Sequence, residues 1–175
     1  MQKSFPALAH LNLWWNSFDL STPFPTIPGI FLGGSSQRLQ CLRLGYISFP
    51  EFPAFLLSAR SLISLKLKEI YNLGYISPGA LVRGLAILTS LTTLSISFCD
   101  ETSPSDQWRN HRGSQTRTVI PVLADFHYKG CSEYLENFLA QFDMPRLNEV
   151  KIKYYTRHFT WQMQVPQHSR FIDRT

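Results

Sequence analysis

A short phrase that recurs six times along the 175 residues constrains the fold of this chain more than any other feature. Each phrase consists of an aliphatic residue, two variable residues, an apolar residue, one variable residue and a second apolar residue. The six sets of anchors are Leu8, Leu11, Leu13; Leu39, Leu42, Leu44; Leu62, Leu65, Leu67; Leu91, Leu94, Ile96; Leu123, Phe126, Tyr128; and Leu147, Val150, Ile152. Their first residues are 31, 23, 29, 32 and 24 positions apart. A unit that returns at such intervals predicts a stacked array of similar supersecondary elements.

The phrase is typical of leucine-rich repeats, in which roughly 20–29 residues form a strand followed by a helix or turn. Two of the five spacings fit that range, one lies at its upper edge, and two are slightly longer because they contain insertions. The ninth position, where Asn or Cys is preferred, holds Asn16, Cys99 and Cys131, but also Ile47, Ile70 and Tyr155. We therefore predict an α/β leucine-rich-repeat solenoid, with a curved parallel sheet of about six strands and helices or turns on its convex side. We expect it to occupy residues 1–175 as a single domain that is part of a solenoid.

The segments between the phrases contain helix signals. Ser77 is a predicted N-cap with Pro78 at the first helical position, and Leu81, Leu85 and Leu88 then share one face.

A second helix is predicted to begin at Ser132 as its cap. Its first turn would hold Glu133 and Glu136, and its apolar stripe would consist of Leu135, Phe138, Leu139 and Phe142. We expect one or two helical turns between residues 45 and 61, and the start of another helix in residues 169–175.

Residues 99–118 differ from the rest of the chain because they contain no aliphatic residue and Trp108 is their only aromatic one. We predict that 99–118 is a flexible loop insertion that leaves the solenoid. Trypsin should cut first within it, at Arg109, Arg112 or Arg117, because ordering such a segment buries no apolar surface.

Cysteine usage and hydropathy favour an intracellular protein. Three cysteines without paired or metal-type spacing give no disulfide framework. The first ten residues lack the apolar core of a secretory signal, and no apolar run approaches the ~20 residues of a membrane helix. We expect reduced thiols, a cytoplasmic or nuclear location and no membrane contact.

The sequence predicts no enzyme, no cofactor and no metal site. The five histidines have no His or Cys neighbours at ligand spacing. Gly33 and Gly34 lack the lysine that a phosphate loop needs, so we interpret them as a helix stop. We expect Cys99 and Cys131 to be buried structural thiols, whereas Cys41 is predicted at a strand position that faces solvent.

The third, fifth and seventh residues of each phrase should line the concave surface, because side chains alternate along a strand. These 18 positions include six basic residues, Arg43, Lys66, Lys68, Lys129, Lys151 and Lys153, and two acidic ones, Asp125 and Glu149, which gives +4 of the chain's net +5. The predicted partner-binding residues are Asn12, Trp14, Arg43, Lys66, Lys68, His127, Lys129, Lys151 and Lys153. Two interpretations stay open: the lysines keep an exposed strand face soluble, or they meet an acidic partner.

Four long phrases carry a resemblance to a known family. They are FLGGSSQRLQCLRL, FPEFPAFLLSARSLISLKL, GYISPGALVRGLAILTSLTTLSI and TRTVIPVLADFHYKGCSEYLENFLAQFDMPRLNEVKI. In this order they resemble the leucine-rich-repeat regions of basidiomycete fungal F-box-type proteins, over most of the chain from about Phe5 to Thr175. The resemblance implies that the repeats hold the protein to be ubiquitinated, while an N-terminal F-box docks to the adaptor of a cullin-based ligase.

The first phrase already begins at Leu8, and the sequence contains no F-box segment. The resemblance therefore implies a substrate-recognition module alone, and an adaptor partner only if an F-box precedes it. We expect a protein partner. The alternatives are binding of nucleic acid or another polyanion through the basic face, which is weaker because the aromatic residues do not alternate with the lysines, and a truncated fragment without independent function.

Overall fold

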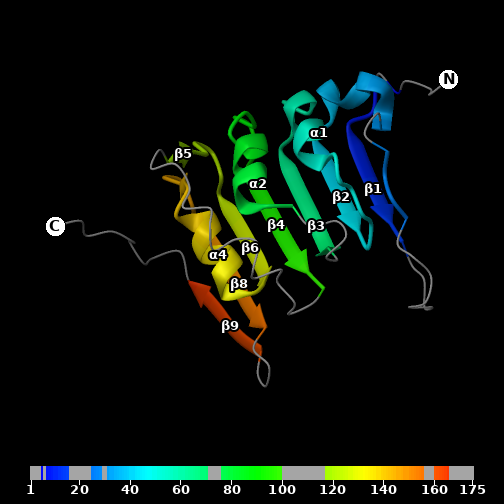
Figure 1. The fold of residues 1–175 in the computed structure, drawn as a ribbon. Coiled ribbons are helices and arrows are strands. Elements are labelled where there is room, and N and C mark those ends of the chain that lie inside the picture. Colours follow the sequence, from blue (N-terminus) through cyan, green and yellow to red (C-terminus); the bar gives the residue numbers. More distant parts are fainter. Residues whose placement is uncertain are drawn as a thin grey trace.

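The computed structural model places the six repeated phrases side by side in one parallel sheet. It describes residues 5, 7–15, 25–28, 31–70, 76–99, 117–155 and 160–165. The parallel strands are β1 (His10–Trp14), β2 (Cys41–Gly45), β3 (Ser64–Ile70), β4 (Thr93–Phe98), β6 (Asp125–Gly130) and β8 (Glu149–Tyr155). Each strand is hydrogen-bonded to the strand of the next phrase, so the sheet follows the order of the sequence (Figure 1).

The register of the sheet follows the repeat. The fourth residues of the phrases align as Leu11, Leu42, Leu65, Leu94, Phe126 and Val150. The sixth residues align as Leu13, Leu44, Leu67, Ile96, Tyr128 and Ile152. The predicted parallel sheet of about six strands and the α/β class are thereby confirmed.

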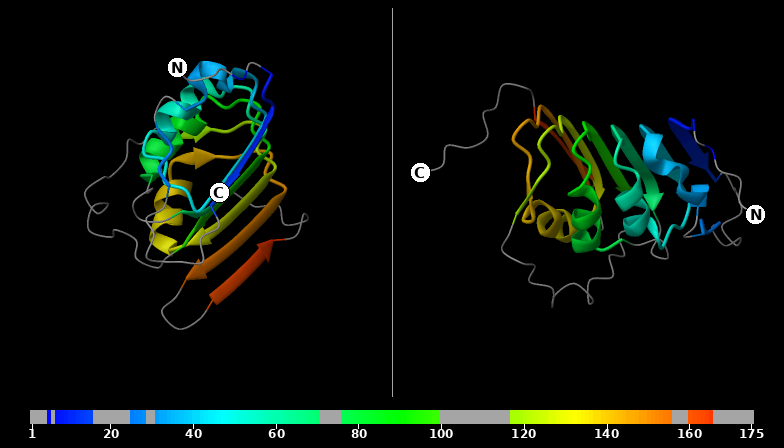
Figure 2. Two further views of the ribbon diagram at one scale, coloured as in Figure 1. Left: turned by 90° about the vertical axis from the view of Figure 1, so that its right-hand side faces the viewer. Right: turned by 90° about the horizontal axis from the view of Figure 1, so that it is seen from above.

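The helices in the described residues cover one face of the sheet (Figure 2). They are the 3₁₀ helix η1 (Phe31–Arg38) and the α-helices α1 (Phe52–Ser58), α2 (Pro78–Leu85) and α4 (Ser132–Leu139). The two short strands β5 (Thr118–Val119) and β7 (Phe142–Asp143) pair with each other in a separate parallel ladder. We call the opposite face of the sheet, which carries the third, fifth and seventh residues of the phrases, the open face.

The core lies between the sheet and these helices. The anchors of the phrases from β2 to β6 are buried, and they contact apolar residues of α1, α2 and α4. Phe126 and Phe138 illustrate this packing, because their nearly parallel rings lie 5.7 Å apart across the β6–α4 interface. At Gly84 a β-carbon would come within 2.7 Å of Leu56, so α1 and α2 can approach this closely only because Gly84 has no side chain.

Local helix signals were partly correct. The amide of Ala80 donates to the Ser77 hydroxyl at 3.0 Å, so the predicted cap of α2 is confirmed. The predicted cap of the next helix was wrong by one residue, because α4 begins at Ser132 and its N-cap is Cys131, whose side chain makes no capping hydrogen bond.

Other differences arise from competing tertiary contacts. Phe142 is buried but lies in β7 instead of extending the apolar stripe of α4, and α4 also buries Tyr134. Its hydroxyl donates to the carbonyl of Ile76 at 3.0 Å, which allows a polar side chain to enter the core. Gly33 and Gly34 do not stop a helix, since η1 continues through them to Arg38.

A seventh strand, β9 (Thr160–Val165), was not predicted from the sequence. It pairs antiparallel with β8 and forms the last strand of the sheet at the C-terminal end. The segment TWQMQV alternates apolar and polar residues, which is the signal that could have identified it. The predicted helix start in 169–175 and residues 100–116 of the predicted loop lie outside the described residues.

Candidate interaction surface

The open face carries three rows of side chains that run across the strands. The first row is His10, Cys41, Ser64, Thr93, Asp125 and Glu149; the second is Asn12, Arg43, Lys66, Ser95, His127 and Lys151; the third contains Trp14, Gly45 and Lys68 in one aligned stretch and Ser97, Lys129 and Lys153 in another. The nine predicted partner-binding residues therefore lie at neighbouring positions on one face. All nine are exposed or half-buried, whereas Gly45 and Ser97 are buried.

The N-terminal end of the third row is organised around an indole ring. Trp14 is 49% exposed, and its ring lies directly over Gly45, in the space that a β-carbon at this position would occupy. The ring meets Tyr46 edge to face at 5.2 Å between centroids, and the Lys68 ammonium lies 5.8 Å from the Trp14 ring centroid. Three neighbours thus hold a large exposed aromatic side chain in place, which lowers the entropy lost when a partner contacts it.

Arg43 and Lys66 form the basic centre of the second row. They are direct neighbours on β2 and β3, and Lys68 follows Lys66 two residues later on the same face. Adjacent strands are about 4.8 Å apart, and next-but-one residues of a strand about 6.7 Å apart. Within the described part of the chain, none of these three cations has a carboxylate within ion-pair distance. Three like charges therefore lie within about one screening length of one another.

Glu69 is an acidic residue of the open face that was not predicted from the sequence. As the eighth residue of its phrase it was expected to leave the face, but its φ is +50° and the β3–β4 register shifts between Leu67 and Ile70. This irregularity brings its carboxylate to Lys129 and Ser97. The face then has six basic and three acidic residues, which corrects its net charge from +4 to +3.

Glu69 is the acceptor of a compact hydrogen-bond network. Its Oε1 accepts from Lys129 Nζ at 2.7 Å and from Ser97 Oγ at 3.0 Å. Burial raises the pKa of Glu69, but the hydrogen bonds from Lys129, Ser97 and Cys99 outweigh it, so the pKa lies below its usual value. Lys129 is therefore neutralised from within the molecule.

Tyr46 also follows its strand with a left-handed backbone, at φ +55°. Its pKa is raised, mainly by burial and then by the neighbouring Glu69 carboxylate. Two eighth-position residues with the same unusual conformation thus place an aromatic and an acidic side chain beside each other. Such φ values are uncommon in residues other than glycine, and no sequence signal at these two positions indicates them.

A second acidic residue, Glu149, contacts one basic side chain of β6, His127, and one of β8, Lys151. Its two carboxylate oxygens lie 2.5 Å from Lys151 Nζ and 3.5 Å from His127 Nε2. The hydrogen bond from Lys151 lowers the pKa of Glu149 most, against an opposing effect of burial, and His127 contributes less. Of the basic residues on β6 and β8, Lys129 and Lys151 are thus paired, while Lys153 is exposed and has no ion pair among the described residues.

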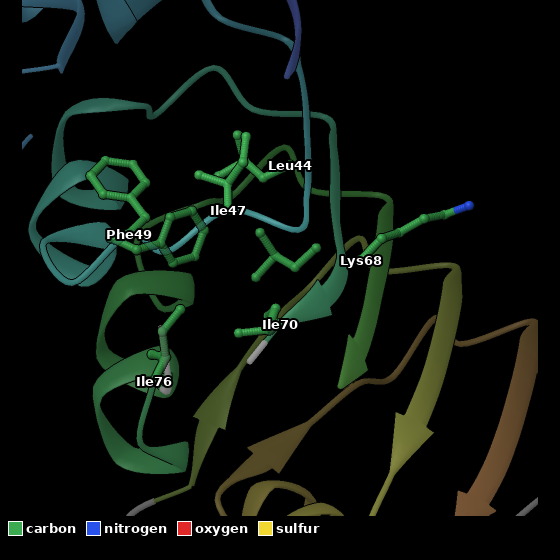
Figure 3. A pocket seen from close by; sticks show the side chains of 8 residues that line it. Leu44, Ile47, Phe49, Lys68, Ile70 and Ile76 are labelled. Carbon is green, nitrogen blue, oxygen red and sulfur yellow. The ribbon is translucent and has the colours of Figure 1, made fainter. Parts of the chain in front are cut away.

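An apolar pocket lies on the core side of the sheet, at the ends of β2 and β3 (Figure 3). Its lining comes from Leu44, Ile47, Phe49, Phe52, Leu67, Lys68, Ile70 and Ile76. The ammonium of Lys68 points away from it. Small-molecule sites combine an apolar wall with converging polar groups, and the described lining supplies none. We interpret this pocket as incomplete packing of the core.

The described residues offer little for metal or thiol chemistry. They contain no group of three or more His, Cys, Asp or Glu side chains that could hold a metal ion. Cys41, Cys99 and Cys131 form no disulfide and are half-buried, so the expectation that Cys99 and Cys131 would be buried was wrong. Cys131 instead accepts a hydrogen bond from the Tyr128 hydroxyl through its backbone carbonyl, at 2.7 Å.

Comparisons with known proteins do not extend this description. No protein-family model matches the chain, and neither a curated protein nor a solved structure shows significant similarity to it. Among the helices of the described residues, none combines the length and apolar character needed to cross a bilayer.

Proposed function

We propose that this chain is a leucine-rich-repeat solenoid that binds another protein through its open face, similar to the substrate-binding repeats of an F-box-type ubiquitin-ligase subunit. The observation that carries the proposal is the register. Six copies of one phrase align strand by strand, so that the same three positions of each repeat line one continuous surface. Stacked repeats of this kind serve as extended binding surfaces.

The composition of that surface supports a protein partner. The face holds an exposed Trp, one Arg and several half-buried lysines, and Trp and Arg are the residues that most often dominate protein interfaces. Polyanion binding is the weaker alternative, because Lys129 and Lys151 already have acidic partners and cannot extend a continuous cationic track. The absence of a disulfide among the three cysteines supports a reducing compartment, so we propose the cytoplasm or nucleus as its location.

Site-specific photo-crosslinking would test the proposal. A photoreactive amino acid replaces Ser95, at the centre of the open face, or in a matched control Ala140, which is exposed just after α4 on the helix-covered side. Each variant is irradiated in an extract of cells that produce the chain. Protein adducts that form from position 95 and not from position 140 would support binding through the open face. Adducts of equal yield from both positions, or adducts removed by nuclease, would contradict it.

A further inference from the structure

Five of the six basic residues of the open face fall into two groups that differ in how their charge is satisfied, and the exposed Lys153 belongs to neither. Arg43, Lys66 and Lys68 lie on the neighbouring strands β2 and β3, and Lys68 lies over the ring of Trp14, which contacts Tyr46; we call these five residues the basic patch. Glu69, Ser97, His127, Lys129, Glu149 and Lys151 form a second group, which we call the paired network. Four ion pairs and hydrogen bonds join its residues, with distances of 2.5 to 3.5 Å between donor and acceptor atoms.

We propose that the basic patch is the binding site for an extended acidic segment of the partner protein, which also presents an apolar side chain to Trp14. This inference rests on the proposed function and adds the place and the chemistry of the contact. The patch is where the described open face has unsatisfied positive charge and a large exposed aromatic ring together.

Charge complementarity identifies the occupant. The three cations of the patch repel one another, and among the described residues no carboxylate lies within ion-pair distance of any of them. Asp or Glu side chains at alternate positions of an extended chain are about 6.7 Å apart, which matches the spacing of Lys66 and Lys68. Binding of such a segment removes the repulsion and replaces it with ion pairs, one of which can be bidentate at Arg43.

The paired network disfavours binding of the acidic segment on β6 and β8, and so restricts it to the basic patch. An acidic segment placed over Lys129 or Lys151 would meet the carboxylate of Glu69 or Glu149 as well. Like charges in contact oppose binding and so direct an acidic ligand toward the patch. A long nucleic acid gains less here, because its affinity grows with the number of phosphates neutralised and the patch offers three neighbouring cations.

A peptide library displayed on phage tests the proposal and leaves the identity of the partner open. Random 12-residue peptides are selected against the full 175-residue chain, and the enriched sequences are synthesised with a fluorescein label for anisotropy titrations. The expected ligands are rich in Asp and Glu and contain at least one large apolar residue. A selection that enriches no acidic peptides above the starting library would overturn the proposal.

Three variants locate the binding. Trp14→Ala and the double variant Arg43→Glu/Lys66→Glu should each weaken the selected peptides by about tenfold or more. The control double variant Arg60→Glu/Arg83→Glu changes two exposed arginines away from the open face and should bind within about twofold of the parent. Thermal unfolding followed by circular dichroism verifies that every variant is folded. Because Trp14→Ala changes no charge, its peptide affinity tests the apolar contact separately from the ion pairs.

The failure of this inference can be separated from failure of the proposed function. Loss of binding in Lys151→Glu/Lys153→Glu, with none in the basic-patch variants, would keep the open face as the interaction surface and overturn the location. Peptides that bind all variants equally would overturn both. A 20-nucleotide oligothymidylate serves as the competitor. If it binds more tightly than the peptides and its affinity falls log-linearly with salt, the ligand of the patch is nucleic acid and the proposed protein segment is overturned.

Discussion

The basic patch and the paired network use similar cations on the same sheet face, but only the network supplies acidic partners for them. In the network, Glu69 and Glu149 bind Lys129 and Lys151 within hydrogen-bond distance. In the patch, Arg43 and Lys66 are neighbours with no described carboxylate between them. We propose that this difference separates two roles of surface lysines: those of the network stabilise the folded state, and those of the patch bind the partner protein.

The largest expected effect is on stability, from removal of the acceptor at the centre of the network. Glu69→Ala removes the ion pair between Lys129 and Glu69 and the hydrogen bond from Ser97 to Glu69, so we expect the free energy of unfolding to fall by about 1–3 kcal/mol. The matched change in the patch, Lys66→Ala, removes no described partner and should stay within about 0.5 kcal/mol of the parent. Urea titrations of the two variants check this, and equal losses would erase the distinction between the regions.

Acidification should weaken the network in the same way. Because the folded-state pKa of Glu69 lies below its ordinary value of 4.5, its carboxylate favours the folded state above that value. That stabilisation is lost as the pH falls through the folded-state pKa. We expect the parent's unfolding free energy to decline more steeply below about pH 5 than that of Glu69→Gln. Parallel urea titrations from pH 7 to pH 3 measure it, and identical curves would contradict the role given to Glu69.

The preorganisation of Trp14 can be tested without removing any charge. Gly45→Ala places a methyl group in the space that the indole occupies, and the exposed ring can swing away at little cost to the fold. We expect acidic peptides to bind this variant several-fold more weakly, through the larger entropic cost of ordering a released side chain. Trp14 fluorescence should shift at the same time. Unchanged affinity together with a displaced ring would show that the indole does not serve as an anchor.

The smallest expected effect comes from removing one carboxylate of the network, so that one of its lysines loses its ion pair as in the basic patch. Glu149→Gln removes the ion pair of Lys151 and the negative charge beside His127, while these half-buried groups near the surface contribute little to stability. We expect unchanged thermal unfolding but tighter retention on heparin, with the salt dependence of binding increased by about one counterion. Retention equal to that of the parent would indicate that Lys151 is already available without the substitution.

The sheet could be predicted from the sequence because the repeat and the register have the same physical cause. Every phrase must bury its fourth and sixth residues, as Leu65 and Leu67 do, so aligned phrases imply aligned strands. The seventh strand was also within reach, since its apolar residues alternate over 160–165. Its signal differs from that of the other six strands, because β9 does not carry the leucine phrase.

The candidate site was less predictable because it depends on backbone irregularities and on pairs between repeats. Alternation assigned Glu69 to the wrong face, and only its left-handed φ returns the carboxylate to Lys129. The same conformation at Tyr46 creates the contact with Trp14. A count of charges by position therefore placed the cations on one face, but it did not show that Lys129 and Lys151 are paired within the molecule.

Lysine reactivity measured on the unmodified chain tests the central distinction most directly. Brief treatment with an amine-acetylating reagent at neutral pH, followed by mass spectrometry of proteolytic fragments, gives a rate for each lysine. An ammonium held in an ion pair reacts slowly, because the carboxylate beside it makes its nitrogen less accessible to the reagent. We predict that Lys66 and Lys68 react several times faster than Lys129, whose ammonium lies 2.7 Å from Glu69. A Lys129 rate equal to or above theirs would contradict the division of the open face into a patch and a network.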